Sequence, residues 1–291
     1  MMFKGAFTAI VTPFSKDKVD YDRLEELLEF QIGEGISGIV PCGTTGESAT
    51  LSHEEHEKVV EFVVKEVRGR VPVIAGAGSN STVEAISLVS HAKAVGADAA
   101  LVITPYYNKP TQEGLYLHFA EVAKKAAIPI VMYNVPSRTG VNMLPPTVAR
   151  LSKIKSIVGL KEATGDMKQV SEVLEFSADG FMILSGDDFT TLTQLCIGAT
   201  GAISVTSNVA PKDMNDMIIS YLNGDHNHAK ELHYKLMPLS RAMFFETNPV
   251  PAKAALGLMK KIKPEVRLPQ APMSDENLKK LKKVMKDYGL I

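Results

Sequence analysis

The sequence predicts an α/β fold, a (β/α)8 TIM barrel followed by a C-terminal helical extension. Short apolar runs rich in Val and Ile alternate with longer amphipathic runs along most of the chain. The apolar runs are nearly continuous in hydrophobicity, which is typical of parallel strands buried on both faces. About eight strand–helix units make one barrel of this class, so a closed barrel accounts for the alternation better than an open sheet does.

Eight runs have the length and composition of buried strands, and they occupy residues 6–11, 38–41, 72–75, 99–103, 130–133, 157–160, 181–184 and 202–205. Helical patterns between them are clearest at residues 22–34, 54–67, 82–95, 114–126 and 146–151. Ser52 and Glu55 have the capping-box spacing, which predicts that a helix begins there. An open doubly wound sheet is the alternative, but Gly76-Ala77-Gly78 lacks the third glycine of a dinucleotide fingerprint.

The strand–helix alternation stops near Gly224. Beyond it the chain is helical in pattern at residues 229–245, 250–259 and 275–288, and Asn248-Pro249-Val250-Pro251 sets off the second of these. We therefore expect residues 1–224 to form a catalytic barrel. Residues 225–291 are expected to form a helical region that serves packing or assembly rather than chemistry.

The composition excludes several classes of protein. The 291 residues carry a net charge of −1, so there is no basic face for nucleic acid. No run reaches the roughly 18 apolar residues of a membrane helix, and the N-terminus lacks the pattern of a signal peptide. The two cysteines, Cys42 and Cys196, have no metal-ligand or redox spacing. We expect a cytoplasmic protein without disulfides.

The residues that follow the strands are those that carry chemistry. In a barrel of this class the reacting groups come from the carboxyl ends of the strands. Here those ends bring hydroxyls, small glycines and one amine, in Gly43-Thr44-Thr45-Gly46-Glu47, Tyr133-Asn134, Lys161-Glu162 and Ser185-Gly186-Asp187-Asp188 among others. These groups are expected to converge on one mouth of the barrel, so the sequence predicts an enzyme.

Lys161 is the most informative of these residues. It lies at the end of the sixth apolar run, Ile157-Val158-Gly159-Leu160. A buried lysine loses hydration, which disfavours its charged form, and a neutral amine is a nucleophile toward carbonyl groups. The alternative is a lysine that reaches solvent at the end of its strand, because lysine is rarely buried.

Four other residues support chemistry at Lys161. Tyr133 ends the preceding strand and is placed to donate and accept protons during imine formation. Thr44 and Thr45 could offer hydroxyls and N–H groups to a carboxylate, although Thr44-Thr45-Gly46-Glu47 also has capping-box spacing. Arg138 can bind a carboxylate through two hydrogen bonds.

Other chemistries fit the sequence less well. None of the seven histidines follows a predicted strand, and His53 and His56 are three residues apart rather than the four of a zinc helix. The pair Asp187-Asp188 could hold a cation but has no histidine beside it, so no catalytic metal is expected. Cys42 is expected to be a small buried hydrophobe, because no histidine pairs with it.

Together three segments resemble a known family. Gly43-Thr44-Thr45-Gly46-Glu47, Tyr133-Asn134-Val135-Pro136-Ser137-Arg138-Thr139-Gly140 and Gly159-Leu160-Lys161-Glu162-Ala163 are similar to signatures of the pyruvate-dependent class I aldolases related to N-acetylneuraminate lyase. The resemblance spans essentially the whole chain. The segment with Arg138 is most similar to that of the family members that condense pyruvate with L-aspartate 4-semialdehyde. Their product is 4-hydroxy-tetrahydrodipicolinate, on the diaminopimelate route to lysine.

The resemblance implies a role for each matching residue. Lys161 would form the Schiff base with pyruvate, and Tyr133 would transfer protons at that centre. Thr44 would link Tyr133 to Tyr107 in a hydroxyl relay, with Tyr107 entering from a neighbouring subunit. The family also implies a homotetramer built as a dimer of dimers. It implies no cofactor, neither metal nor pyridoxal phosphate, because the lysine imine itself is the electron sink.

Substrate binding is implied for four further positions. Thr45 would bind the pyruvate carboxylate, with backbone around Gly186 and Ile203 close by. Arg138 would bind the carboxylate of aspartate semialdehyde.

A regulatory site for L-lysine is implied at a subunit interface by Ser48, Ala49, Leu51, His53, His56, Asn80, Glu84 and Tyr106. His56 and Glu84 would serve the charges of the bound amino acid. The alternative is that these two are solvated helix residues. Three other functions stay open: an aldolase of sugar-derived 2-keto acids, a metal-dependent aldolase, and a non-catalytic barrel that binds a carboxylate.

Overall fold

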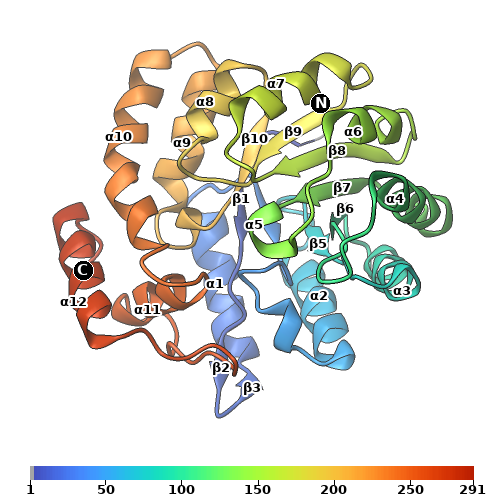
Figure 1. The fold of residues 1–291 in the computed structure, drawn as a ribbon. Coiled ribbons are helices and arrows are strands. Elements are labelled where there is room, and N and C mark those ends of the chain that lie inside the picture. The colour runs from blue at the N-terminus through green and yellow to red at the C-terminus, as the bar shows by residue number, and fades with distance from the viewer. Residues whose placement is uncertain (1–2) are drawn as a thin grey trace.

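Eight parallel strands form the centre of the molecule in a computed structural model that describes residues 3–291 (Figure 1). They are β1 (Gly5–Ala9), β4 (Gly38–Val40), β5 (Ile74–Gly76), β6 (Ala99–Ile103), β7 (Ile130–Asn134), β8 (Ile157–Glu162), β9 (Met182–Ser185) and β10 (Gly201–Ser204). Their order in the sheet is β4-β1-β10-β9-β8-β7-β6-β5. Each overlaps one predicted run, so the predicted strands are confirmed.

The two ends of this sheet meet. A parallel bridge joins Ile39 on β4 to Val73, just ahead of β5. The Gly76 N–H donates to the Pro41 carbonyl at 2.9 Å. The sheet therefore closes into the predicted (β/α)8 barrel, and all its strand ends point to a common mouth.

Helices surround the barrel (Figure 1). They are α1 (Tyr21–Gly33), α2 (His53–Val67), α3 (Thr82–Ala94), α4 (Gln112–Ala126), α5 (Pro136–Thr139), α6 (Pro145–Leu151), α7 (Met167–Phe176), α8 (Thr191–Cys196) and α9 (Pro211–Leu222). The predicted capping box is present, because the Glu55 N–H donates to Ser52 and the Ser52 N–H donates to Glu55. Among residues 3–291, no helix is both long and apolar enough to cross a membrane.

The core has two layers. Side chains such as Phe7, Ile74 and Ile203 fill the interior of the barrel. A larger layer lies between the strands and the surrounding helices, and it includes Val60 and Phe119. This packing is what strands that are apolar on both faces require.

Three helices follow the barrel: α10 (His226–Ala242), α11 (Val250–Leu258) and α12 (Asp275–Tyr288). They lie on the side of the barrel away from α3 and α4 (Figure 1). Leu236, Leu256 and Leu281 belong to the same core as the barrel helices. The predicted helices of this region are confirmed. A boundary at residue 224 stays a prediction, and residues 1 and 2 of the predicted barrel range lie outside the described residues.

A small hairpin precedes α1, with β2 (Phe14–Ser15) pairing antiparallel to β3 (Lys18–Val19). Its turn places Lys16 and Asp17 at positive φ. The sequence reading did not predict it, because strands of two residues carry no measurable period.

The close approach of β1 and β10 predicts that a side chain at Gly201 would destabilise the barrel. Gly201 lies opposite Gly5, and a Cβ on Gly201 would lie 2.2 Å from the Gly5 carbonyl oxygen. The variant Gly201→Ala should therefore lose about 2–3 kcal/mol of unfolding free energy, measured by denaturant unfolding. Gly33→Ala is the control, because its Cβ would meet nothing within 4 Å. Equal stability of the two variants would contradict the packing described here.

Candidate active site

Lys161 and Tyr133 lie side by side inside the barrel mouth. They are paired residues of the adjacent strands β8 and β7. The Lys161 ammonium nitrogen is 4.2 Å from the centre of the Tyr133 ring. Each side chain is 6% exposed. The predicted adjacency is thus present, and the alternative of a lysine that reaches solvent is wrong.

Burial changes the acidity of both groups. Desolvation lowers the pKa of Lys161 to about 7, although the charge of Asp188 acts to raise it and that of Arg138 lowers it further. Burial also raises the pKa of the Tyr133 phenol, against the effects of Arg138 and Thr44. Near neutral pH the pair therefore combines an amine that is partly neutral with a phenol that keeps its proton.

Gly186 leaves the space that Lys161 occupies. It follows β9, and a Cβ at this position would lie 2.9 Å from Cε of Lys161 and 2.8 Å from Cβ of Ala163. Ile203 lies on β10, next to β9, with its side chain 1% exposed in the barrel interior. Gly186 thus lies against the Lys161 side chain and Ile203 belongs to the same barrel interior, while their part in substrate binding stays a prediction.

Thr44 and Thr45 follow β4 on the loop above the barrel. Thr44 lines the cavity at the barrel mouth. Its side chain hydrogen-bonds the Tyr133 phenol, which partly offsets the rise in the pKa of that phenol that burial causes. Thr45 is 2% exposed, and its hydroxyl accepts a hydrogen bond from the Asn248 amide at 3.0 Å. The capping alternative is wrong, because no helix begins at Thr44 and Glu47 makes no capping bond to the short 3-10 turn Ser48–Thr50.

Arg138 reaches the same mouth from α5. Its guanidinium donates to the Asn248 carbonyl at 3.2 Å, and its side chain is otherwise exposed along the cavity. The sequence reading missed Asn248 and took its Pro-rich segment only as a helix boundary. The expectation that residues 225–291 serve packing or assembly is therefore incomplete, because this region lines the site.

Tyr107 is not brought to Lys161 within one chain. Its side chain is 89% exposed and its φ is +72°, a left-handed conformation that is unusual for tyrosine. It does not line the cavity. The expected relay from Tyr107 through Thr44 is thus incomplete within a single chain.

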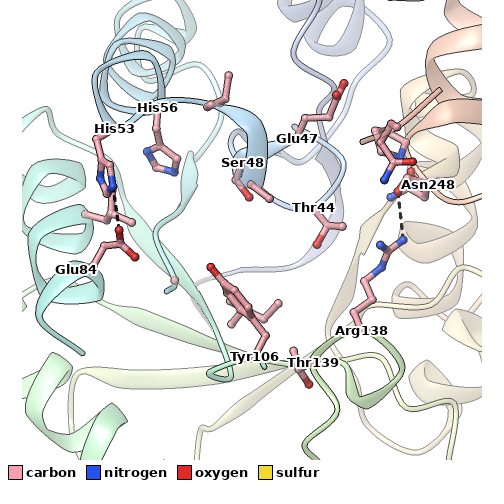
Figure 2. A pocket seen from close by; sticks show the side chains of 17 residues that line it. Thr44, Glu47, Ser48, His53, His56, Glu84, Tyr106, Arg138, Thr139 and Asn248 are labelled. Atoms are coloured by element: carbon pink, nitrogen blue, oxygen red, sulfur yellow. Dashed lines mark hydrogen bonds and ion pairs between the residues drawn. The ribbon is translucent and has the colours of Figure 1, made fainter. Parts of the chain in front are cut away.

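One cavity of about 390 Å³ runs from the barrel mouth to the start of α2. Figure 2 shows Arg138 and Asn248 at one side of it, His53 and Glu84 at the other, and Thr44 between them. The lining includes nearly all residues of the implied lysine site: Ser48, Ala49, Leu51, His53, His56, Glu84 and Tyr106. Asn80 does not line it.

Glu84, expected to serve a charge of the bound amino acid, lies at the far side of the cavity and forms an ion pair with His53 at 2.9 Å (Figure 2). His56 is buried, and desolvation lowers its pKa to about 4, so it is neutral at pH 7. The alternative of a solvated helix residue is wrong for His56.

Asp188 was considered only as a metal ligand, yet its charge acts to raise the pKa of Lys161. Its Oδ2 accepts hydrogen bonds from Val205 N–H at 3.1 Å and Thr206 N–H at 2.8 Å. Its buried Oδ1 has no partner among residues 3–291. No group of three His, Cys, Asp or Glu residues suited to a metal ion occurs in that range.

The thiol of Cys42 is buried, and burial raises its pKa. This environment favours the thiol over the thiolate, which fits the expected small buried hydrophobe rather than a nucleophile.

Comparisons with known proteins decide the family. The model of the Dihydrodipicolinate synthetase family matches residues 2–288. A 4-hydroxy-tetrahydrodipicolinate synthase from Thermodesulfovibrio yellowstonii is 59% identical, with 100% of each chain covered. The chain belongs to the dihydrodipicolinate synthetase family.

Two solved structures of this family carry ligands. The dihydrodipicolinate synthase of Acinetobacter baumannii, complexed with pyruvate, is 45% identical with a TM-score of 0.97, and 99% of each chain is covered. The enzyme of Cyanidioschyzon merolae with lysine bound is 38% identical with a TM-score of 0.96, over 100% of this chain and 99% of that one.

The lowered pKa of Lys161 predicts the pH dependence of imine formation. Below pH 7 the amine is mostly protonated and cannot attack, so trapping of pyruvate with borohydride should rise between about pH 6 and pH 8 and then level off. Mass spectrometry of the reduced adduct measures the rate. In Asp188→Asn the rise should move to lower pH, because Asp188 holds the pKa of Lys161 up. A rise that continues to pH 10 would contradict this environment.

Proposed function

We propose that the protein condenses pyruvate with L-aspartate 4-semialdehyde to give 4-hydroxy-tetrahydrodipicolinate, in lysine biosynthesis by the diaminopimelate route. The observation that carries the proposal is the buried Lys161, with its pKa lowered to about 7, beside the Tyr133 phenol. The synthase name of the Thermodesulfovibrio yellowstonii relative and the pyruvate complex of the Acinetobacter baumannii enzyme support the same reaction.

The first half of the reaction forms an imine. The neutral Lys161 amine adds to the ketone of pyruvate, and water leaves with protons supplied by Tyr133. The cationic iminium then draws electrons, so a methyl proton is lost and an enamine forms. The protein's own amine acts as the electron sink, and the proposal includes neither metal nor pyridoxal phosphate.

The second half joins the two substrates. The enamine carbon attacks the aldehyde of aspartate semialdehyde and leaves a hydroxyl group. The amino group of that substrate then displaces Lys161 from the imine, which closes the ring and frees the enzyme. We assign the semialdehyde carboxylate to Arg138 and the pyruvate carboxylate to Thr45 and the backbone near Gly186.

The proton relay requires a second chain. Tyr107 is exposed on a left-handed turn and lies outside the cavity of its own chain. This position supports the proposal that Tyr107 enters the site of a neighbouring subunit in a dimer. We propose in addition that two such dimers form a tetramer. We also propose a cytoplasmic location, since the protein's two cysteines, Cys42 and Cys196, form no disulfide.

We further propose that L-lysine binds at the far side of the cavity. Glu84 offers a carboxylate for an amino group, and His56, which carries no charge at neutral pH, lines the same side of the cavity. The lysine-bound Cyanidioschyzon merolae enzyme supports this proposal.

Trapping with borohydride tests the reaction class first. Incubation with pyruvate and borohydride should add a reduced pyruvyl group to Lys161, and Lys161→Ala should fold normally and give no adduct. An unmodified Lys161 in folded protein would instead favour a barrel that only binds a carboxylate.

Arg138 tests the second substrate. Arg138→Ala should still form the pyruvate adduct but should lower kcat/KM for aspartate semialdehyde by about 100-fold, because a charged partner of the carboxylate is lost. Steady-state kinetics with each substrate varied in turn measures this. Unchanged kinetics, with turnover of a sugar-derived 2-keto acid, would point to a different aldolase.

Titration with L-lysine tests the regulatory site. Wild-type activity should fall at millimolar lysine, and Glu84→Gln should lose that response because the partner for an amino group is neutralised. The response to lysine would be independent of this cavity if Glu84→Gln were inhibited like wild type.

A further inference from the structure

The loop that carries Thr44 and Thr45 has a strained backbone. Cys42 and Glu47, at its two ends, have φ values of +53° and +54°. Non-glycine residues in this region persist only where the surrounding structure fixes them. The turn is too tight for a larger residue at Gly46, where a Cβ would lie 3.0 Å from the Cys42 nitrogen. The loop therefore depends on contacts from outside itself.

A buried ion pair supplies one such contact. The Glu47 carboxylate pairs with the ammonium of Lys253 on α11, and the two side chains are 2% and 0% exposed. The other Glu47 oxygen accepts the Arg267 N–H at 3.1 Å. Lys253 also donates to the Glu265 carbonyl at 2.8 Å and lies 3.9 Å from the centre of the Phe14 ring. Both charges are thus fully enclosed and paired.

Such a pair is a poor source of stability by itself. Removing two charges from water costs nearly as much as their attraction returns, and apolar replacements of the same volume are often as stable. Buried ion pairs are better explained where they fix how two segments sit relative to each other. Here the two segments are the Thr44–Thr45 loop and the start of α11.

A second contact joins the same two segments. The Asn248 amide, just ahead of α11, donates to Thr45 Oγ1 at 3.0 Å. Thr45 and Glu47 are thus held by Asn248 and Lys253, at two separate points. Two points fix the orientation of the loop as well as its position, and the Thr44 hydroxyl lies beside them, facing the cavity (Figure 2).

We infer that Glu47 and Lys253 are positioning residues for the reaction: through them the C-terminal helical region holds the loop that carries Thr44 and Thr45 in its place at the barrel mouth. The inference rests on the proposed function for its kinetic consequence. Lys161 is on β8, and the charges that shift its pKa are those of Asp188 and Arg138 rather than of Glu47 or Lys253, so the loss of the pair should displace the loop and leave the amine in place.

The test uses Lys253→Met, Glu47→Gln and the double variant in the full-length chain. Each single variant leaves one buried group without its partner and should lower the Tm, whereas the double variant should regain most of that loss. All three should still form the pyruvate adduct on Lys161 at saturating pyruvate. Their kcat/KM for pyruvate should fall by 10- to about 100-fold, because a displaced loop misplaces the reacting groups.

Asp213→Asn is the matched control for stability. Asp213 on α9 pairs with Lys235 at 2.6 Å and accepts from Tyr288, away from the loop. This variant should lower the Tm and keep kcat/KM within about 2-fold. Hydrogen exchange of residues 42–50 should be faster in the Glu47 and Lys253 variants only.

The outcomes separate the two hypotheses. A double variant with wild-type kcat/KM and unchanged exchange in residues 42–50 would overturn the positioning role. Equal losses of activity in Asp213→Asn would also overturn it, since instability alone would then explain them. No Lys161 adduct in the wild type would instead reject the proposed function, and the exchange result would still decide whether the ion pair holds the loop.

Discussion

The site depends above all on one constraint, the burial of the Lys161 amine away from water. A lysine charge inside the barrel would lose most of its hydration, and this desolvation lowers the pKa of Lys161 from 10.5 to about 7. By linkage the group opposes folding at pH values below about 7, by about 5 kcal/mol, and this penalty declines as the pH rises toward 10.5. Only a large core can tolerate it. The same penalty yields a partly neutral amine, the form that the proposed reaction needs, so instability and the proposed reactivity at Lys161 have one cause.

The neighbours of the amine divide between the barrel and its loops. Strand pairing fixes Tyr133 beside Lys161, and β9 brings Gly186 against its side chain. Hydrogen bonds across the sheet hold these groups without help from elsewhere. Thr45 lies on the loop after β4 and Arg138 on the short helix α5, and both contact Asn248, which belongs to the C-terminal region. The barrel therefore carries the buried amine, and the C-terminal region contributes to the lining of the cavity.

Sequence reasoning succeeded where the chemistry follows local pattern. Apolar runs located all eight strands, and the order of the strands placed Tyr133 next to Lys161. It failed where a partner comes from a distant segment. Asn248 and Lys253 meet the Thr44–Thr45 loop only through the tertiary fold, and no spacing relates residue 47 to residue 253. The contact of Glu84 with His53 likewise depends on side-chain direction between two helices.

The shape of the cavity links catalysis to the proposed regulation. Thr44 and His53 are separated by nine positions in the chain, and both line the same space. The segment between them includes Glu47 and the cap of α2, where Arg267 binds Glu55 at 2.6 Å and the Thr50 carbonyl at 3.0 Å. A ligand beside His53 therefore contacts a segment that is anchored at several points and that also carries Thr44. Because packed segments of this kind shift as units rather than deform gradually, a small displacement at one side of the cavity has a direct path to the hydroxyl at the other.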